Sequence, residues 1–216
     1  MTPSTHSQPL AFWNDACKHL AKRDRVMNKL IPKCGSRQLQ CRGDAFTTLA
    51  RSVVGQQISV KAAQAVWDRL IAAIPGTASN LHPASVQRLA APDMRAIGLS
   101  TRKIEYLHDL AKHFSTAAVE EHRWSQMDDE AIIDMLVAIR GIGRWTAEMF
   151  LIFHLGRPDV LPLDDRGLLN GISVNYFSGE PVSRAEAREL GDAWAPFRSV
   201  ATWYIWRSLE PAPIVA

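Results

Sequence analysis

The chain has 216 residues, which is enough for one full-sized domain or two small lobes, with a core that needs no disulfide or metal. Its three cysteines, Cys17, Cys34 and Cys41, form no close metal-type pair and indicate reduced thiols. No apolar stretch reaches the length of a membrane span, and the first residues lack the order of a secretory signal. We therefore expect a soluble, intracellular protein without membrane partners.

The formal net charge of +3 is small, but basic residues are unevenly distributed. From residue 18 to residue 42 the only acidic residue is Asp24, and eight residues are basic: Lys18, Lys22, Arg23, Arg25, Lys29, Lys33, Arg37 and Arg42. Such a cluster attracts phosphate backbones. A solvated helix face explains the same residues equally well, so both interpretations stay open on this segment alone.

Apolar residues recur at spacings of three and four along the chain, which is typical of helices. The expected helix starts carry capping or first-turn residues: Ser59, Pro83, Pro92, Asp128, and the capping-box pair Ser183 and Glu186. Alternating β-branched patterns hardly appear, so the sequence predicts an almost all-α protein of roughly eight to ten short helices. Residues 1–8 are predicted to be a disordered tail.

Two stretches share the order helix, glycine, short turn, helix: AIGLSTRKIEYLHDL (96–110) and IRGIGRWTAEMFLIF (139–153). In the second stretch, Gly141 can end a helix in the left-handed region, and Gly143 leaves no side chain over the next helix start. Bare N–H groups at that start suit an anion such as a phosphodiester, to which Arg144 and Thr146 can add contacts. An ordinary tight turn between packed helices is the alternative for an isolated Gly-Ile-Gly.

Two adjacent carboxylates, Asp164 and Asp165, follow the apolar connector 160–163 and precede the apolar residues of a new helix. Capping a helix start requires only one of them. The other carboxylate is therefore a candidate for chemistry.

Four motifs, in the order GQQISVKAA, LVAIRGIGRWTA, VLPLDDRGLL and WAPFRSVATWYIW, resemble those of the helix-hairpin-helix DNA glycosylase superfamily over approximately residues 40–210. The likeness is greatest to the 3-methyladenine DNA glycosylase II branch. It implies an all-α fold, a single domain over residues 9–216 made of two helical lobes with a DNA-binding cleft between them. It also implies a monofunctional enzyme of base excision repair, which flips alkylated purines out of double-stranded DNA and hydrolyses the N-glycosidic bond, leaving an abasic site.

The resemblance implies that Asp165 is the catalytic carboxylate that stabilises the oxocarbenium-like sugar, with Asp164 as a neighbour that caps or orients. The residues then expected to bind the substrate are Trp145, Trp206, Met149 and Asp164, and the aromatic faces among them suit an electron-poor ring. Bifunctional relatives carry a Schiff-base lysine at the position of Trp145, so we expect base removal without strand cleavage. Trp13, Trp67, Trp124 and Trp194 are interpreted as structural, and the endonuclease III iron–sulfur cluster is not expected because its four cysteines are missing.

The same resemblance places DNA on the two hairpins and on the GQQIS segment. The residues assigned to DNA binding are Gln57, Ser100, Lys103, Gly141, Gly143, Arg144 and Thr146. Gln57 matches the residue that fills the gap left by the flipped base, although glutamines 56 and 57 can instead bridge helix termini. Main-chain carbonyls of Val137, Ile139 and Ile142 are expected to hold a monovalent cation, and no other cofactor is required.

Two other functions fit parts of the pattern. A non-catalytic DNA-binding protein would keep the hairpin without the chemistry, which Asp165 and the aromatic residues argue against. A glycosylase for mispaired or oxidised bases would keep the chemistry with another pocket, and Gln57 and Met149 leave that alternative open. We expect a monomer, cytoplasmic or nucleoid-associated in a bacterium and nuclear in a eukaryote.

Overall fold

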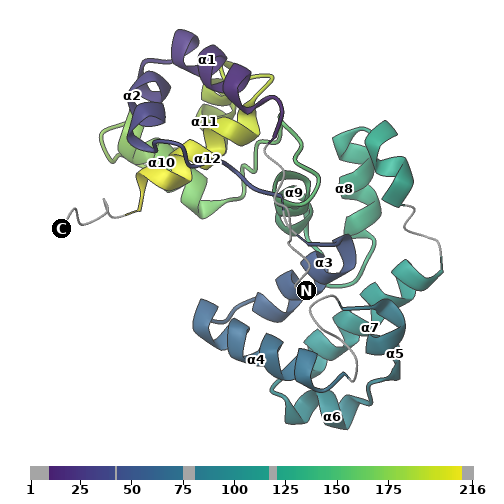
Figure 1. The fold of residues 1–216 in the computed structure, drawn as a ribbon. Helices are drawn as coiled ribbons and strands as arrows, with labels where there is room; N and C mark the ends of the chain where they lie inside the picture. Colours follow the sequence, from purple (N-terminus) through teal and green to yellow (C-terminus); the bar gives the residue numbers. More distant parts are fainter. Residues whose placement is uncertain (1–9, 42, 75–80, 117–120, 211–216) are drawn as a thin grey trace. The chain divides into compact units, whose positions relative to one another are not determined.

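The computed structural model describes residues 10–41, 43–74, 81–116 and 121–210. These residues form twelve α-helices and one short 3-10 helix, and no β-strand occurs among them, so the predicted all-α class is confirmed (Figure 1). The number of helices exceeds the prediction because α5 (Pro83–Arg88) and α6 (Ala91–Ala96) have six residues each, too few for a full apolar repeat. The tail predicted over residues 1–8 lies outside the described residues.

The chain divides into two compact units. The central unit comprises residues 42–150, and the terminal unit comprises residues 1–41 together with 151–216. The central unit contains α3 (Ala45–Gly55), α4 (Val60–Ala72), α5, α6, α7 (Thr101–Ser115), the 3-10 helix Glu121–Gln126, α8 (Asp129–Val137) and most of α9 (Arg144–Phe153). The terminal unit contains α1 (Trp13–Arg23), α2 (Arg25–Lys33), α10 (Arg166–Tyr176), α11 (Arg184–Asp192) and α12 (Arg198–Ser208).

Local sequence signals set the helix starts. Ser59 caps α4, Asp128 caps α8, and Ser183 forms a reciprocal capping box with Glu186 at the start of α11, all as predicted. The two predicted first-turn prolines also stand in the first turns of α5 and α6. Each of these helices therefore begins where its own sequence provides a partner for an N–H group or removes that group.

Helix α7 is at the centre of the packing in the central unit. It contacts α3, α5 and α6, and Leu107, Leu110 and Ala111 on it are completely buried. Trp67 and Trp124 are buried in the same unit, in agreement with their interpretation as structural residues. Helix α7 is therefore the core of the central unit.

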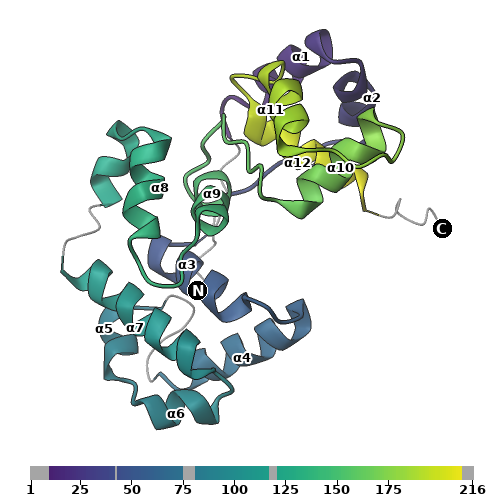
Figure 2. The same cartoon turned by 180° about the vertical axis from the view of Figure 1, so that it is seen from behind.

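Helix α12 is the core of the terminal unit. Every side chain from Ser199 to Ile205 is buried, and α12 contacts α1, α2 and α10 (Figures 1 and 2). Trp13 and Trp194 are also buried in this unit, as predicted for structural tryptophans. A helix buried on all sides is fixed by packing, so it is a firm support for residues at its end.

A buried carboxylate ties the helices of the terminal unit together. Asp24 is 8% exposed, and its Oδ1 accepts the N–H groups of Val26 at 2.7 Å and Met27 at 2.9 Å at the start of α2. Its Oδ2 accepts the Tyr176 hydroxyl at 2.7 Å and the Trp194 indole N–H at 2.9 Å. Burial, and then the bond to Asp24, raise the pKa of Tyr176, which therefore stays a hydrogen-bond donor.

Candidate functional site

The turn between α8 and α9 requires glycine at position 141. Gly141 has φ +85°, and a Cβ placed there would lie 2.3 Å from the ring of Tyr106 on α7. The Gly141 carbonyl accepts a hydrogen bond from the Gln56 side chain at 2.8 Å. The predicted left-handed glycine is thus confirmed, and the end of α3 helps to fix the turn.

Position 143 is open. A Cβ on Gly143 would meet no atom within 4 Å, and its carbonyl accepts the N–H of Ala147 at 3.0 Å as α9 begins. A residue without a side chain cannot cap the helix that follows it. The start of α9 is therefore accessible over Gly143, and Trp145 in its first turn is 45% exposed.

Of the two side chains assigned to DNA binding at this hairpin, Arg144 has partners within the protein and Thr146 is buried. The Arg144 guanidinium binds Glu130 with both terminal nitrogens, at 2.9 and 2.5 Å, and its Nε contacts Glu148 at 3.1 Å. Arg144 holds the pKa of Glu130 below its usual range. Thr146 is 6% exposed. This arrangement favours main-chain N–H groups, rather than these side chains, as the first partners of a phosphate.

The α6–α7 hairpin repeats the backbone of the first one. Gly98 has φ +100°, and α7 begins three residues later at Thr101. Here the Ser100 side chain caps the helix by accepting the N–H of Lys103 at 3.4 Å. The Lys103 ammonium donates to the Val54 carbonyl at 2.7 Å, and burial lowers its pKa. Both residues therefore support the fold of the central unit, whatever they add to DNA binding.

The two glutamines that follow α3 have different surroundings. Gln56 bridges α3 to the hairpin, which is the structural role considered for it. Gln57 is exposed and has φ +58°, a left-handed conformation that costs a non-glycine residue about 1 kcal/mol or more. Ile58 and Val60 beside it are 41% and 89% exposed. A strained, exposed residue that is followed by exposed apolar side chains is suited to insertion into another molecule.

The main-chain carbonyls predicted to hold a cation belong to the last residue of α8 and to the turn that follows it. The Ile139 carbonyl accepts the N–H of Ile142 at 3.1 Å, and a carbonyl oxygen has a second lone pair for another partner. Carbonyl oxygens are ligands that hard cations prefer, so the carbonyls of Val137, Ile139 and Ile142 fit a monovalent ion chemically. Among the described residues, no group of three or more histidines, cysteines and carboxylates is placed to bind a metal.

The terminal unit contains the carboxylate corner, which we define as Asp165, Gly167, Trp206 and Phe153. Asp165 caps α10: its Oδ1 accepts the Leu168 N–H at 2.6 Å and the Trp206 indole N–H at 2.8 Å. Two donors converge on a single oxygen, so the plane of the carboxylate is fixed. Residues of α10 and α12 therefore hold Asp165, the catalytic candidate identified from the sequence.

The expectation that Asp164 caps the helix is wrong. Asp165 is the cap, because its backbone has the extended conformation that an N-cap requires. Asp164 is exposed and forms an ion pair with Arg184 at 2.6 Å. The adjacent carboxylates therefore have different surroundings, and a substrate contact by Asp164 stays a prediction.

Two residues of the carboxylate corner were not identified from the sequence. Phe153 stacks on Trp206, with ring centroids 5.6 Å apart and planes at 12°. A Cβ on Gly167 would lie 3.1 Å from Asp165 Oδ1 and 3.3 Å from the Trp206 ring, so glycine lets the indole approach the carboxylate. A glycine directly after Asp-Asp-Arg was the available signal for this close approach.

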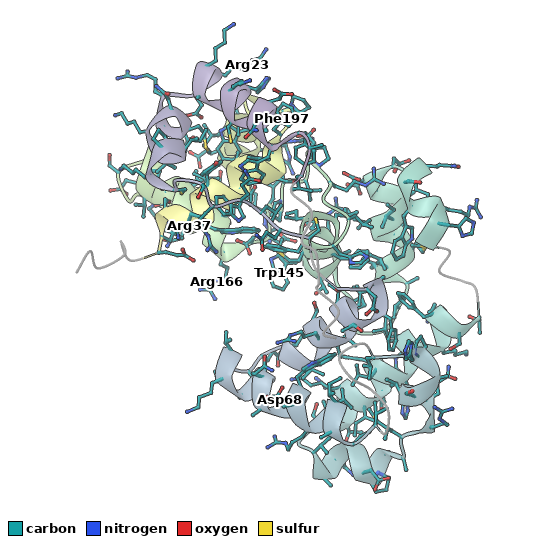
Figure 3. The ribbon with its side chains drawn as sticks, viewed as in Figure 1. Arg23, Arg37, Asp68, Trp145, Arg166 and Phe197 are labelled. Atoms are coloured by element: carbon teal, nitrogen blue, oxygen red, sulfur yellow. The ribbon has the colours of Figure 1, made fainter. Side chains whose placement is uncertain are left out.

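The predicted site residues fall into two groups. The central unit contains the DNA-binding candidates, and also Trp145 and Met149, one helical turn apart on α9. The terminal unit contains Asp164, Asp165 and Trp206. Figure 3 shows the Trp145 side chain on its ribbon.

Comparison with known proteins identifies the family of this chain. Residues 50–196 match the family described as HhH-GPD superfamily base excision DNA repair protein. The chain is 31% identical to DNA-3-methyladenine glycosylase 1 of Schizosaccharomyces pombe over 199 residues, covering 90% of this chain and 86% of the relative.

Two solved structures are similar over nearly the whole chain. A DNA-3-methyladenine glycosidase from Bacillus halodurans has a TM-score of 0.82 at 33% identity, covering 96% of this chain and 92% of that one. The S. pombe 3-methyladenine DNA glycosylase in complex with abasic DNA has a TM-score of 0.77 at 30% identity, covering 90% and 96%. With the hairpin and the capped carboxylate in place, the chain belongs to the HhH-GPD superfamily of base excision DNA repair proteins.

Proposed function

We propose that this protein is a monofunctional DNA glycosylase that flips alkylated purines out of double-stranded DNA and hydrolyses their N-glycosidic bond. The observation that carries the proposal is Asp165, held at Oδ1 by two N–H donors at the start of α10. Two proteins that this chain matches over most of their length are named DNA-3-methyladenine glycosylase 1 and DNA-3-methyladenine glycosidase. The product is an abasic site in an uncut strand.

Asp165 acts on the sugar. As the bond breaks, the base leaves with the electron pair and the deoxyribose becomes an oxocarbenium-like cation. A carboxylate about 4 Å away at an effective dielectric of about 20 stabilises that cation by roughly 4 kcal/mol. The same carboxylate can take a proton from the water that attacks the sugar.

The leaving group supplies much of the remaining rate. Enzymes commonly lower barriers by at least about 8 kcal/mol, which is more than one carboxylate provides. A purine alkylated on a ring nitrogen is already cationic and leaves as a neutral base. A site built around one fixed carboxylate is therefore sufficient for alkylated purines.

Trp206 is a positioning residue in this proposal. Its indole N–H is donated to Asp165, and Phe153 stacks on one of its faces. Trp145 is the more exposed of the two aromatic candidates at 45%, so we assign contact with the flipped base to Trp145, with Met149 one turn further along. The thioether of Met149 makes a soft, adaptable wall.

DNA is held by the hairpins. A phosphate binds the N–H groups at the start of α9 over Gly143, and a monovalent cation at the carbonyls of residues 137, 139 and 142 would strengthen that contact. Gln57 enters the gap that the flipped nucleotide leaves, and Ser100 and Lys103 support the second hairpin. We expect the enzyme to act as a monomer where chromosomal DNA is present.

The test is incubation with methylated DNA in the presence of a chelator, followed by chromatographic identification of the released bases. Wild-type protein should release methylated purines and leave strands that break only after alkali. Asp165→Asn should abolish release and still bind abasic DNA. Asp164→Asn, which makes the same charge change at the adjacent residue, should retain most of the activity.

Two results would contradict the proposal. Strand cleavage without alkali would mean a bifunctional enzyme, which Trp145 is expected to exclude. If the protein released only mispaired or oxidised bases, the glycosylase reaction would stand, but the assigned substrate class would be wrong.

A further inference from the structure

Helices α1 and α2 have an exposed side that carries a basic face. Their apolar sides are buried, through Trp13, Leu20, Met27 and Leu30. The basic face consists of six exposed residues: Lys18, Lys22, Arg23, Arg25, Lys29 and Lys33. Nitrogen-tipped side chains extend away from both ribbons (Figure 3), with Arg23 labelled among them.

Few acidic groups neutralise this face. Asp24, the acidic residue between residues 18 and 42, is buried, and both its oxygens accept hydrogen bonds from inside the terminal unit. Lys18 lies 3.8 Å from Asp15, but the two side chains are 81% and 78% exposed, so the pair contributes little. The other five residues of the basic face form no ion pair within the described part of the chain.

Helix stability does not explain the charges on α2. Arg25, Lys29 and Lys33 follow one another at intervals of four, so they share one stripe of the helix, where like charges repel. Arg25 is the first residue of α2, where the helix dipole disfavours a cation, and no acidic residue stands in the first turn. Lys33, in the last turn, interacts favourably with the helix dipole, but Arg25 and Lys29 do not stabilise the helix, so an external anion is a suitable partner for this stripe.

The geometry of the stripe suits a nucleic-acid backbone. Four residues of α-helix rise about 6 Å, so the three cations span about 12 Å. One strand of duplex DNA presents a phosphate about every 3.4 Å along the axis, so three to four phosphates fall within that span. Long arginine and lysine side chains reach phosphates without reading bases.

We propose that the basic face is a second DNA-binding surface, separate from the two hairpins, that holds the phosphates of undamaged duplex without sequence preference. This inference rests on the proposed function, because DNA is the polyanion such an enzyme must search. The basic face would hold the protein on undamaged duplex between lesions, and its contribution is electrostatic.

The test uses the triple variant Arg25→Gln, Lys29→Gln and Lys33→Gln, since glutamine is a good helix former. Affinity for an undamaged duplex is measured against salt concentration. Each phosphate contact contributes about 0.9 to the slope of log K against log salt, so the slope should fall by roughly 2 to 3. The control Arg88→Gln, Lys112→Gln and Arg188→Gln makes the same charge change at scattered exposed sites and should lower the slope by less than about 1.

Equal slopes for the two triple variants would overturn the proposal. The proposal would also be overturned if the wild-type protein bound anionic phospholipid vesicles and the test variant did not, while both proteins bound the duplex equally. If circular dichroism shows that the test variant loses helix, Lys29→Gln with Lys33→Gln replaces it, with an expected loss of about 2 in slope.

A separate measurement distinguishes this inference from the proposed function. Single-turnover release from a short methylated duplex, at saturating protein, should be unchanged in the test variant. If the wild-type protein releases no base, the proposed function fails, while the salt slopes still decide whether the basic face binds DNA.

Discussion

The starts of α9 and α10 differ in whether a side chain caps their N–H groups. Each helix begins with N–H groups that lack an intrahelical partner. At α10 the Asp165 side chain occupies the start by accepting the N–H of Leu168. At α9 the preceding residue is Gly143, which has no side chain and open space above it. One start is closed by a carboxylate that is also the catalytic candidate, and the other is left open for a ligand.

This difference separates two uses of a helix terminus. The capped start fixes a charged side chain in one orientation, with Trp206 as a second donor. The open start presents partial positive charge to an incoming anion. Removing the charge at the start of α10 should therefore affect the chemistry, and closing the start of α9 should affect DNA binding.

The largest effect is expected from Asp165→Ser. Serine is also a good cap, so it should keep the hydrogen bond to Leu168 and the stability of α10. It has no charge, so release of methylated bases should fall by about a thousandfold, corresponding to roughly 4 kcal/mol. Thermal unfolding and single-turnover release measure the two properties. Loss of both together would mean that Asp165 is only a structural cap.

Gly141→Ala should destabilise the protein by about 3 kcal/mol. The new Cβ would meet the Tyr106 ring at 2.3 Å, and the residue would be held at φ +85°. Denaturant unfolding gives the value. Gly143→Ala is the matched control and should change stability by less than about 1 kcal/mol, because its Cβ enters open space. Similar losses in both variants would contradict the difference between the two glycines.

Gly143→Asp closes the open start. The new carboxylate should cap α9 and stabilise the protein by about 0.3 kcal/mol, while it repels the phosphate proposed to bind there. Affinity for abasic DNA, measured by fluorescence anisotropy, should fall by about tenfold or more, about 1.4 kcal/mol. Unchanged affinity would show that phosphate does not bind at the start of α9.

Trp206→Phe removes one donor from Asp165 and leaves a ring to stack on Phe153. A hydrogen bond to a charged group contributes about 1.5 kcal/mol, so the release rate should fall by roughly tenfold. Affinity for abasic DNA should stay the same. A large loss of affinity instead would place Trp206 against the DNA or the base, as first expected from the resemblance.

Glu130→Gln gives the smallest effect and tests Arg144. The neutral side chain releases the guanidinium from its paired contacts and removes a negative charge beside the start of α9. DNA affinity should rise by about twofold to fivefold, the size expected for an exposed charge pair. A matched substitution at another exposed carboxylate, Glu189→Gln on α11, should change it less.

The sequence predicted those features that depend on neighbouring residues. Caps at Ser59 and Asp128, the capping box at Ser183 and the left-handed Gly141 all follow from local rules, and the structure confirms them. The helix-hairpin-helix family also followed, because its motifs are short and contiguous. Within the pair of aspartates, however, the capping residue depends on backbone angles that residue types do not reveal.

Contacts over long sequence separations were not predictable in this way. Trp206 reaches Asp165 across 41 residues, and Trp194 reaches Asp24 across 170. Arg144, which was assigned to DNA binding, also binds Glu130 on the preceding helix, a contact that the sequence did not reveal. In each case a polar side chain has several plausible partners in the sequence, and only the packing of helices selects one.

The left-handed backbone of Gln57 has a consequence for any attempt to replace this residue. Glycine and asparagine adopt that conformation at low cost, whereas valine, isoleucine and threonine resist it. A library at this position should therefore contain mainly flexible, unbranched side chains. β-Branched replacements would change the path of the loop and not only the shape of its tip.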